Sequence, residues 1–112
     1  MKFSFSSNRL QRQLESGASM QRAYGDRAKP LMRRIAILAE ANCLADVPGR
    51  PPERCHPLKG DRAGQFAVVV KDNWRLVFMP DHDPLPLDAD GALDLRGVTA
   101  IRIMEVVDYH GE

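Results

Sequence analysis

The sequence has few of the features that mark secreted or membrane proteins. Only two of its 112 residues are cysteine, so a disulfide-rich fold is not expected and Cys43 and Cys55 are predicted to be buried thiols. The longest apolar runs, Ile35–Ala39 and Phe66–Val70, are far too short to cross a bilayer. Residues 1–15 alternate polar and apolar side chains and carry charges, unlike a secretory signal. We therefore expect a soluble, cytoplasmic protein.

The length and the distribution of charge narrow the possibilities further. A chain of 112 residues suffices for one hydrophobic core, so we predict a single domain. The net charge of +1 conceals an asymmetry: residues 1–79 hold 14 Lys/Arg against 7 Asp/Glu, whereas residues 80–112 hold 2 against 8. This pattern predicts a surface that faces a polyanion, together with a separate acidic element. Two solvated faces without a partner are the alternative.

The N-terminal part predicts a short strand followed by two helices. Phe3 and Phe5 alternate with polar residues, as in an edge strand. Apolar residues one turn apart predict a first helix over residues 8–16, which Gly17 is expected to close. A second helix is expected to start near Asp26, because that start places Pro30 in the first turn. Its apolar stripe is expected to contain Leu31, Ile35, Leu38 and Ala39.

From residue 63 the period of the apolar residues changes to two, which indicates strands. Gln65–Lys71 and Trp74–Met79 are predicted to pair through a hairpin, and Val98–Val107 returns to strand composition. On the second strand, alternation places Trp74, Leu76 and Phe78 on one face and Arg75, Val77 and Met79 on the other. The pattern predicts an α+β fold, with a short N-terminal strand and two helices packed on an antiparallel meander of three strands. Residues 80–97 form an acidic insertion in this domain.

Three polar groups stand out against this pattern. The first is the segment from Cys55 to Arg62, the second is Arg75, and the third is Asp108-Tyr109-His110. A meander brings the start of one strand close to the end of an antiparallel neighbour. The first and third groups could therefore meet at one edge of the sheet.

These residues suit the cleavage of RNA through its own 2′-hydroxyl. That reaction needs a base, an acid, and cations that stabilise the transition state. His56 and His110 can fill the proton-transfer roles, since histidine titrates near neutral pH. Lys59, Arg62 and Arg75 can hold the phosphate. No metal or cofactor is required, because the substrate carries its own nucleophile.

Each of these residues also has an ordinary structural interpretation. His56 could be a hydrogen-bonded surface histidine, and His82 in the acidic connection is expected to be exposed. Arg75 could pair with a carboxylate across the sheet, and Trp74 is expected in the core. A zinc site would have to combine Cys43, Cys55, His56 and His110, and their spacing does not support one. Spacing alone leads only to an α+β domain that interacts with nucleic acid.

Three segments resemble the HigB family of RelE-superfamily toxins. They are Arg54–Val68 (RCHPLKGDRAGQFAV), Asn73–Phe78 (NWRLVF) and Val106–His110 (VVDYH), and the resemblance covers most of the chain. It implies a microbial-RNase-like α+β fold and endonucleolytic cleavage of messenger RNA, typically on the ribosome. It also implies a helix-turn-helix, HigA-like antitoxin as partner, with a dimer of heterodimers as the family's complex.

The resemblance assigns roles residue by residue. The catalytic residues it implies are His56, Asp108, Tyr109 and His110. Lys59 and Arg75 would bind the scissile phosphate, with Arg62 as a further contact. The alternative function is a non-catalytic binding or regulatory protein, such as the neutralising "killer suppression" protein. The sequence argues against it, because it has no recognisable helix-turn-helix and keeps the polar residues of the toxin motif.

Pro80–Gly97 departs from the family pattern, in which a short turn joins the last two strands. One interpretation is a flexible insertion that the fold tolerates. The other is that the acidic insertion alters antitoxin docking, or that it lies beside the basic groove and competes with RNA.

Overall fold

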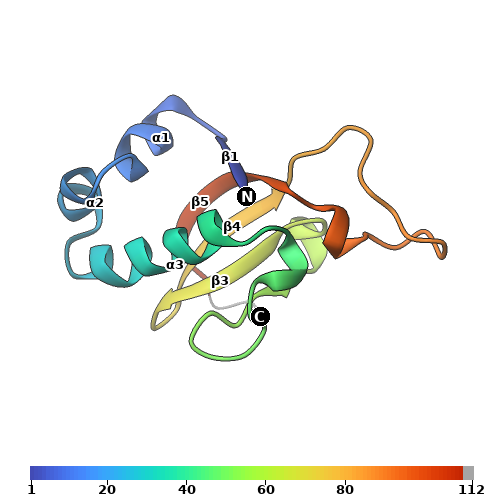
Figure 1. Cartoon of the computed structure of the whole chain (residues 1–112). Coiled ribbons are helices and arrows are strands. Elements are labelled where there is room, and N and C mark those ends of the chain that lie inside the picture. Colours follow the sequence, from blue (N-terminus) through green and yellow to red (C-terminus); the bar gives the residue numbers. More distant parts are fainter. Residues whose placement is uncertain (110–112) are drawn as a thin grey trace.

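One mixed sheet of five strands carries its three α-helices on a single face. The computed structural model describes residues 1–109. Its main elements are β1 (Lys2–Phe5), α1 (Asn8–Leu14), α2 (Gly17–Tyr24), α3 (Ala28–Glu40), β2 (His56–Pro57), β3 (Phe66–Lys71), β4 (Trp74–Pro80) and β5 (Ala100–Asp108). The strand order is β1-β5-β4-β3-β2, with β1 parallel to β5 and all other neighbours antiparallel. Figure 1 shows α3 lying across the sheet, α1 and α2 at one end, and the connection between β4 and β5 projecting at the other.

The N-terminal segment forms two helices where one was predicted. The hydroxyl of Ser7 caps α1, and the hydroxyl of Ser16 accepts a hydrogen bond from the backbone N–H of Ser19 to cap a second helix. Gly17 therefore begins α2 and does not close α1 as expected. A serine N-cap satisfies one of the free N–H groups of a new helix, and Met20 buries the inner face of α2.

The long helix α3 follows the prediction in outline. A 3₁₀ turn at Gly25–Arg27 precedes it, and Pro30 is its third residue, in the first turn where proline is tolerated. Its buried residues are Ala28, Leu31, Arg34 and Leu38. Ala39, expected on the apolar stripe, is exposed, and Arg34 is buried in its place.

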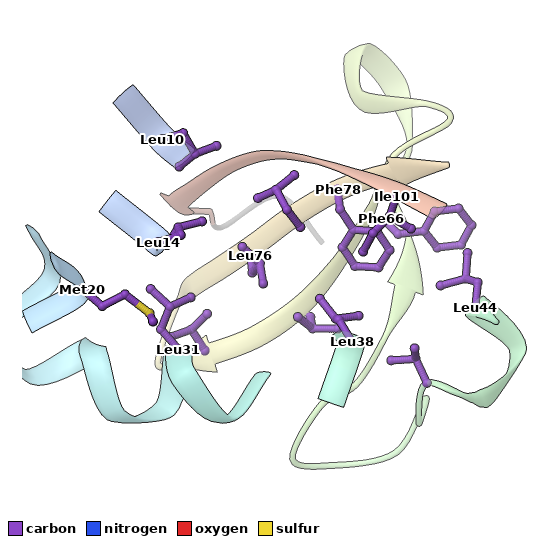
Figure 2. Packing of buried hydrophobic residues seen from close by; sticks show 14 of the residues in the cluster. Leu10, Leu14, Met20, Leu31, Leu38, Leu44, Phe66, Leu76, Phe78 and Ile101 are labelled. Atoms are coloured by element: carbon purple, nitrogen blue, oxygen red, sulfur yellow. The ribbon is translucent and has the colours of Figure 1, made fainter. Parts of the chain in front are cut away.

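The main core fills the space between the helices and the sheet. Figure 2 shows side chains from α1, α2 and α3 pointing toward residues of the central strands. Among these, Leu31, Leu38, Leu76, Phe78 and Ile101 are fully buried. Leu76 and Phe78 occupy this face as predicted, and Val77 between them packs on the other face.

The connection between β4 and β5 is held by internal hydrogen bonds. Nε2 of His82 accepts the backbone N–H groups of Thr99 at 3.0 Å and of Ala100 at 3.2 Å. Leu87 and Leu93 form an isolated antiparallel bridge within the loop. His82, expected to be exposed, is half-buried because it anchors the return of the chain into β5.

The predicted α+β class, the short N-terminal strand and the three-stranded meander are confirmed, and one strand, β2, is added. β2 extends the meander at one edge, and β1 joins β5 at the other. Within the described part of the chain, no helix has the length and apolar character needed to cross a membrane.

Candidate functional site

The face of the sheet away from the helices holds a second, smaller cluster. Its buried members are Leu58, Ala67 and Val77. Met104, Val107 and Tyr109 pack against them and are partly exposed. This helix-free face therefore combines a small apolar patch with solvent access, which is where polar functional groups can lie.

A β-bulge in β5 decides which of its residues reach the helix-free face. Val77 of β4 pairs with Glu105, but the next residue, Phe78, pairs with Ile103. Met104 is therefore an extra residue in β5 and has no paired residue on β4. An extra residue of this kind shifts the side-chain alternation of the strand that follows it.

The shift brings the end of β5 to the candidate site. Ile103 lies in the main core, and regular alternation would place Val107 on the same side. Because of the bulge, Val106 packs on the main core, while Val107 and Tyr109 join the small cluster on the helix-free face. The bulge thus directs Tyr109 toward this face.

Cross-strand pairing aligns the predicted residues on the same face. One row across β2, β3, β4 and β5 consists of His56, Ala67, Val77 and Glu105. In the next row, Arg75 pairs with Val107. Directly paired residues project to the same side of a sheet. His56 and Arg75 therefore lie on the helix-free face.

The ring of His56 is oriented by the backbone just before β2. Its Nδ1 lies 2.6 Å from the carbonyl oxygen of Arg54. A carbonyl only accepts hydrogen bonds, so Nδ1 carries the proton, and in the neutral ring Nε2 is the basic nitrogen. Arg54 adopts a left-handed conformation with φ of 48°, which costs about 1 kcal/mol for a non-glycine residue. The residue whose carbonyl orients His56 is therefore held in a conformation that is unfavourable for a non-glycine residue.

The loop from residues 58 to 65 covers the small cluster. The backbone N–H of Leu58 donates to the carbonyl of Gln65 at 2.9 Å, and the buried Leu58 side chain anchors the loop. Gly60 and Gly64 have φ of 63° and 88°, conformations that favour glycine. Lys59 is exposed at the start of the 3₁₀ turn that this loop contains.

Arg62 links this loop to the last strand. Its Nη2 lies 3.1 Å from Oε1 of Glu105, and its guanidinium lies 5.1 Å from the centre of the Tyr109 ring. The first and third polar groups therefore meet, as predicted, through Arg62 and Tyr109. Arg62 is partly exposed, so its guanidinium can reach a ligand on this face.

Arg75 is buried beneath the site. Its Nη1 donates to the carbonyl oxygens of Asp72 at 2.6 Å and Trp74 at 3.2 Å. These bonds tie the guanidinium to the hairpin between β3 and β4. Trp74 itself packs on the main core, as predicted, with the guanidinium of Arg27 at 3.8 Å from its ring centre.

The two remaining residues of the last group are placed differently. Asp108 pairs with Trp74, which assigns it to the row on the helix side, and it is exposed. The structure therefore does not bring its side chain to the face that carries Tyr109. His110 lies outside the described residues.

Glu105 is a site residue that sequence reasoning did not single out. It is a carboxylate in an apolar strand, three residues before Asp108, and it holds Arg62. Its polarity at a strand position was the only signal available, because the bulge that sets its face is not visible in the sequence.

Cys55 directly precedes His56 but offers no thiolate as a nucleophile. Cys43 and Cys55 are both free thiols, and burial raises the pKa of Cys55 to about 11, so its thiol stays protonated at neutral pH. No three His, Cys, Asp or Glu side chains gather to hold a metal ion anywhere in residues 1–109.

A curated relative matches part of the chain. It is the endoribonuclease HigB of Proteus vulgaris, which is 52% identical over 25 residues. The match covers 22% of this chain and 27% of the length of that relative. No protein-family model matches the chain.

Two solved toxin structures share the fold over nearly the whole chain. A YoeB/ParE toxin from Agrobacterium tumefaciens superposes with a TM-score of 0.58, covering 98% of this chain and 100% of its own. A variant of the toxin YafQ from E. coli gives a TM-score of 0.56, with 96% and 91% covered. Both are 14% identical to this chain, which shows the fold alone. With the HigB segment, they confirm the resemblance to RelE-superfamily toxins.

Proposed function

We propose that this chain, which has the fold of the RelE-superfamily toxins, is the toxin of a type II toxin–antitoxin system and an endoribonuclease that cleaves messenger RNA. The observation that carries the proposal is the helix-free face of the sheet. Segments far apart in the sequence bring His56, Arg62 and Tyr109 to that face around a small apolar patch. An imidazole beside guanidinium groups suits phosphoryl transfer at a ribose.

In the proposed reaction, the 2′-oxygen of the ribose attacks the adjacent phosphorus. A base removes the 2′-hydroxyl proton as the new O–P bond forms, and an acid protonates the 5′-oxygen as its bond to phosphorus breaks. The products are a 2′,3′-cyclic phosphate and a 5′-hydroxyl. His56 transfers one proton through Nε2, since Nδ1 is bonded to Arg54. We assign the other proton transfer to His110, with either histidine as the base.

The cationic side chains are proposed to stabilise the phosphorane-like transition state. Arg62 would exchange the carboxylate of Glu105 for a phosphate oxygen, while the Tyr109 ring keeps its guanidinium oriented. Exposed Lys59 would contact the phosphate as a point charge, and Arg75 would approach it from below.

The remaining roles follow from the position of the last strand. We propose that Asp108 is a positioning residue that fixes the strand end carrying Tyr109 and His110. The proposed reaction uses no metal, because the attacking oxygen belongs to the substrate. We further propose that the protein acts in the cytoplasm on ribosome-bound messenger RNA and that a HigA-like helix-turn-helix antitoxin neutralises it.

The decisive experiment is controlled expression without any antitoxin, with RNA 5′ ends mapped in the same cells. Wild type should arrest growth and produce new 5′-hydroxyl ends. His56→Ala should lower cleavage by about 10²–10⁴-fold and relieve the arrest, because it removes one proton-transfer group. His82→Gln keeps a hydrogen-bond acceptor at the other described histidine and should leave cleavage unchanged.

Two outcomes would contradict the proposal. A wild-type chain that neither arrests growth nor cleaves RNA would favour the non-catalytic alternative. Full cleavage by His56→Ala would show that the reaction does not use this histidine. Circular dichroism of each variant confirms that the fold is retained.

A further inference from the structure

The acidic connection between β4 and β5 builds an apolar pocket against the edge of the sheet. The pocket encloses about 270 Å³. Its apolar lining includes Pro57, Phe66, Met79, Leu85, Leu87 and Leu93. The pocket is thus made jointly by the insertion and by the strands β2, β3 and β4.

The insertion also displays the exposed apolar side chains of the molecule. Among the described residues, the exposed large hydrophobic side chains are Leu85, Leu87 and Leu95, at 48%, 59% and 41% exposure. All three belong to this one connection. Two of them, Leu85 and Leu87, also line the apolar pocket. Scattered exposed leucines are ordinary, but exposed leucines at an apolar pocket mark a binding surface.

The loop that presents these leucines is held in place. Besides the bonds to His82, a carboxylate oxygen of Asp88 accepts the backbone N–H groups of Asp90 at 2.8 Å and Ala92 at 3.0 Å. A Cβ on Gly97 would lie 2.7 Å from Cβ of Pro86, so only glycine lets these segments pack. A surface that is already ordered loses less entropy when a ligand binds.

The charge around the pocket selects among possible occupants. The connection carries Asp81, Asp83, Asp88, Asp90 and Asp94 against Arg96. No ion pair involves these aspartates within residues 1–109. Asp81, Asp88 and Asp94 directly follow the lining residues Pro80, Leu87 and Leu93 in the sequence. An acidic connection next to the pocket repels the phosphates of RNA and attracts a cationic peptide.

We propose that this pocket binds a partner protein through a leucine-like apolar side chain flanked by lysine or arginine. A second copy of this chain fits less well. Among the described residues, its one exposed large hydrophobic side chain next to a basic residue is Leu95, beside Arg96, and Asp94 on the other side of Leu95 would be repelled by the acidic connection. Apolar anchors in a pocket, with complementary charges at the rim, are the usual arrangement of a protein interface.

A partner bound in this pocket would affect RNA cleavage, because of where the pocket lies; this step rests on the proposed function. Pro57 and Gln65 line the pocket. Pro57 pairs with Phe66 on the helix side of the sheet, so Gln65 is the lining residue that connects the pocket to the candidate site. Gln65 also lies 3.5 Å from Nη1 of Arg62, at the candidate site. A peptide segment in this pocket would lie beside the cleavage site and hinder the entry of RNA. The insertion would therefore serve the neutralisation of the toxin.

The test uses the full chain and a defined probe, a fluorescein-labelled peptide of sequence Lys-Arg-Ser-Leu-Leu-Ser-Arg-Lys. Fluorescence anisotropy should show binding about tenfold tighter than for peptides with the leucines replaced by serine or the basic residues by glutamate. Leu87→Ser should weaken binding about fivefold or more. Leu95→Ser is the matched control, because Leu95 is exposed in the same insertion but does not line the pocket.

Equal binding of the three peptides, or equal loss in Leu87→Ser and Leu95→Ser, would overturn the proposal. The proposal would also be overturned if Leu87→Ser weakened the binding of an oligoribonucleotide, because RNA would then be the occupant of the pocket. RNA cleavage by Leu87→Ser, measured separately, should equal that of wild type. If the wild-type protein cleaves no RNA but still binds the peptide selectively, the proposal of ribonuclease activity is wrong and the proposal of a docking surface still holds.

Discussion

The two faces of the central sheet are built from the same strands but differ in almost everything else. On the helix side, the core spans every strand from β1 to β5 except β2 and meets all three α-helices. On the helix-free side, three buried residues form a small cluster beneath a loop that carries Lys59 and Arg62. Neighbouring residues of β4, such as Phe78 and Val77, therefore pack on opposite faces of the sheet.

This difference separates stability from function along a single strand. The helix side buries large apolar surface, which is the dominant stabilising contribution to a fold. The helix-free side buries little and carries the cations and the imidazole of the candidate site. Substitutions on the first face should change the free energy of unfolding, and those on the second should change RNA cleavage.

The largest expected effect is that of Phe78→Ala on the helix side. Phe78 is fully buried and stacks on Phe66 with ring centres 6.0 Å apart. Its removal should lower the free energy of unfolding by about 3–5 kcal/mol, measured by urea denaturation. Val77→Ala, in the small cluster on the other face, serves as the comparison and should cost about 1–3 kcal/mol. An equal loss at both positions would contradict the division between the faces.

The next effect concerns the buried ion pair between Arg34 of α3 and Glu53. Arg34 and Glu53 lie 3.9 Å apart with side chains 10% and 11% exposed, and Nε of Arg34 donates to the carbonyl of Val69. Arg34→Met should lower the free energy of unfolding by about 3 kcal/mol, because it leaves the Glu53 carboxylate buried without its partner. Arg34→Met combined with Glu53→Met should recover part of that loss in the same denaturation assay. No recovery would show that the hydrogen bond to Val69, and not the ion pair, stabilises this region.

Elements whose buried apolar side chains recur at a regular spacing were predicted from the sequence, and elements without such a spacing were missed. The strands β3, β4 and β5 and the helix α3 were predicted within a few residues, because their buried side chains recur at regular spacing. α2 was missed because Met20 is its only large apolar buried residue and Gly17 resembles a helix end. β2 has two residues, and only its pairing with β3 defines it.

The candidate site was predictable in its segments but not in its geometry. The meander correctly implied that the loop near Arg62 meets the chain near Tyr109. Which side chains of β5 face that loop depends on one extra residue, Met104, and no sequence pattern reports a bulge. The same register places Asp108 on the helix side, which the motif alone did not indicate.

The smallest expected effect is that of Glu105→Gln on the helix-free face. It tests directly whether the two faces of the sheet differ in their contributions to stability and to RNA binding. The Arg62–Glu105 pair is shorter than the Arg34–Glu53 pair, at 3.1 Å, but its side chains are 26% and 45% exposed. Exposed pairs contribute about 0–1 kcal/mol, so unfolding should barely change. RNA binding should strengthen about two- to fivefold in fluorescence anisotropy with a non-cleavable oligoribonucleotide, because Arg62 no longer has a carboxylate competing with phosphate. A loss of several kcal/mol in stability, or weaker RNA binding, would mean that Glu105 holds the structure of this face and is not displaced by substrate.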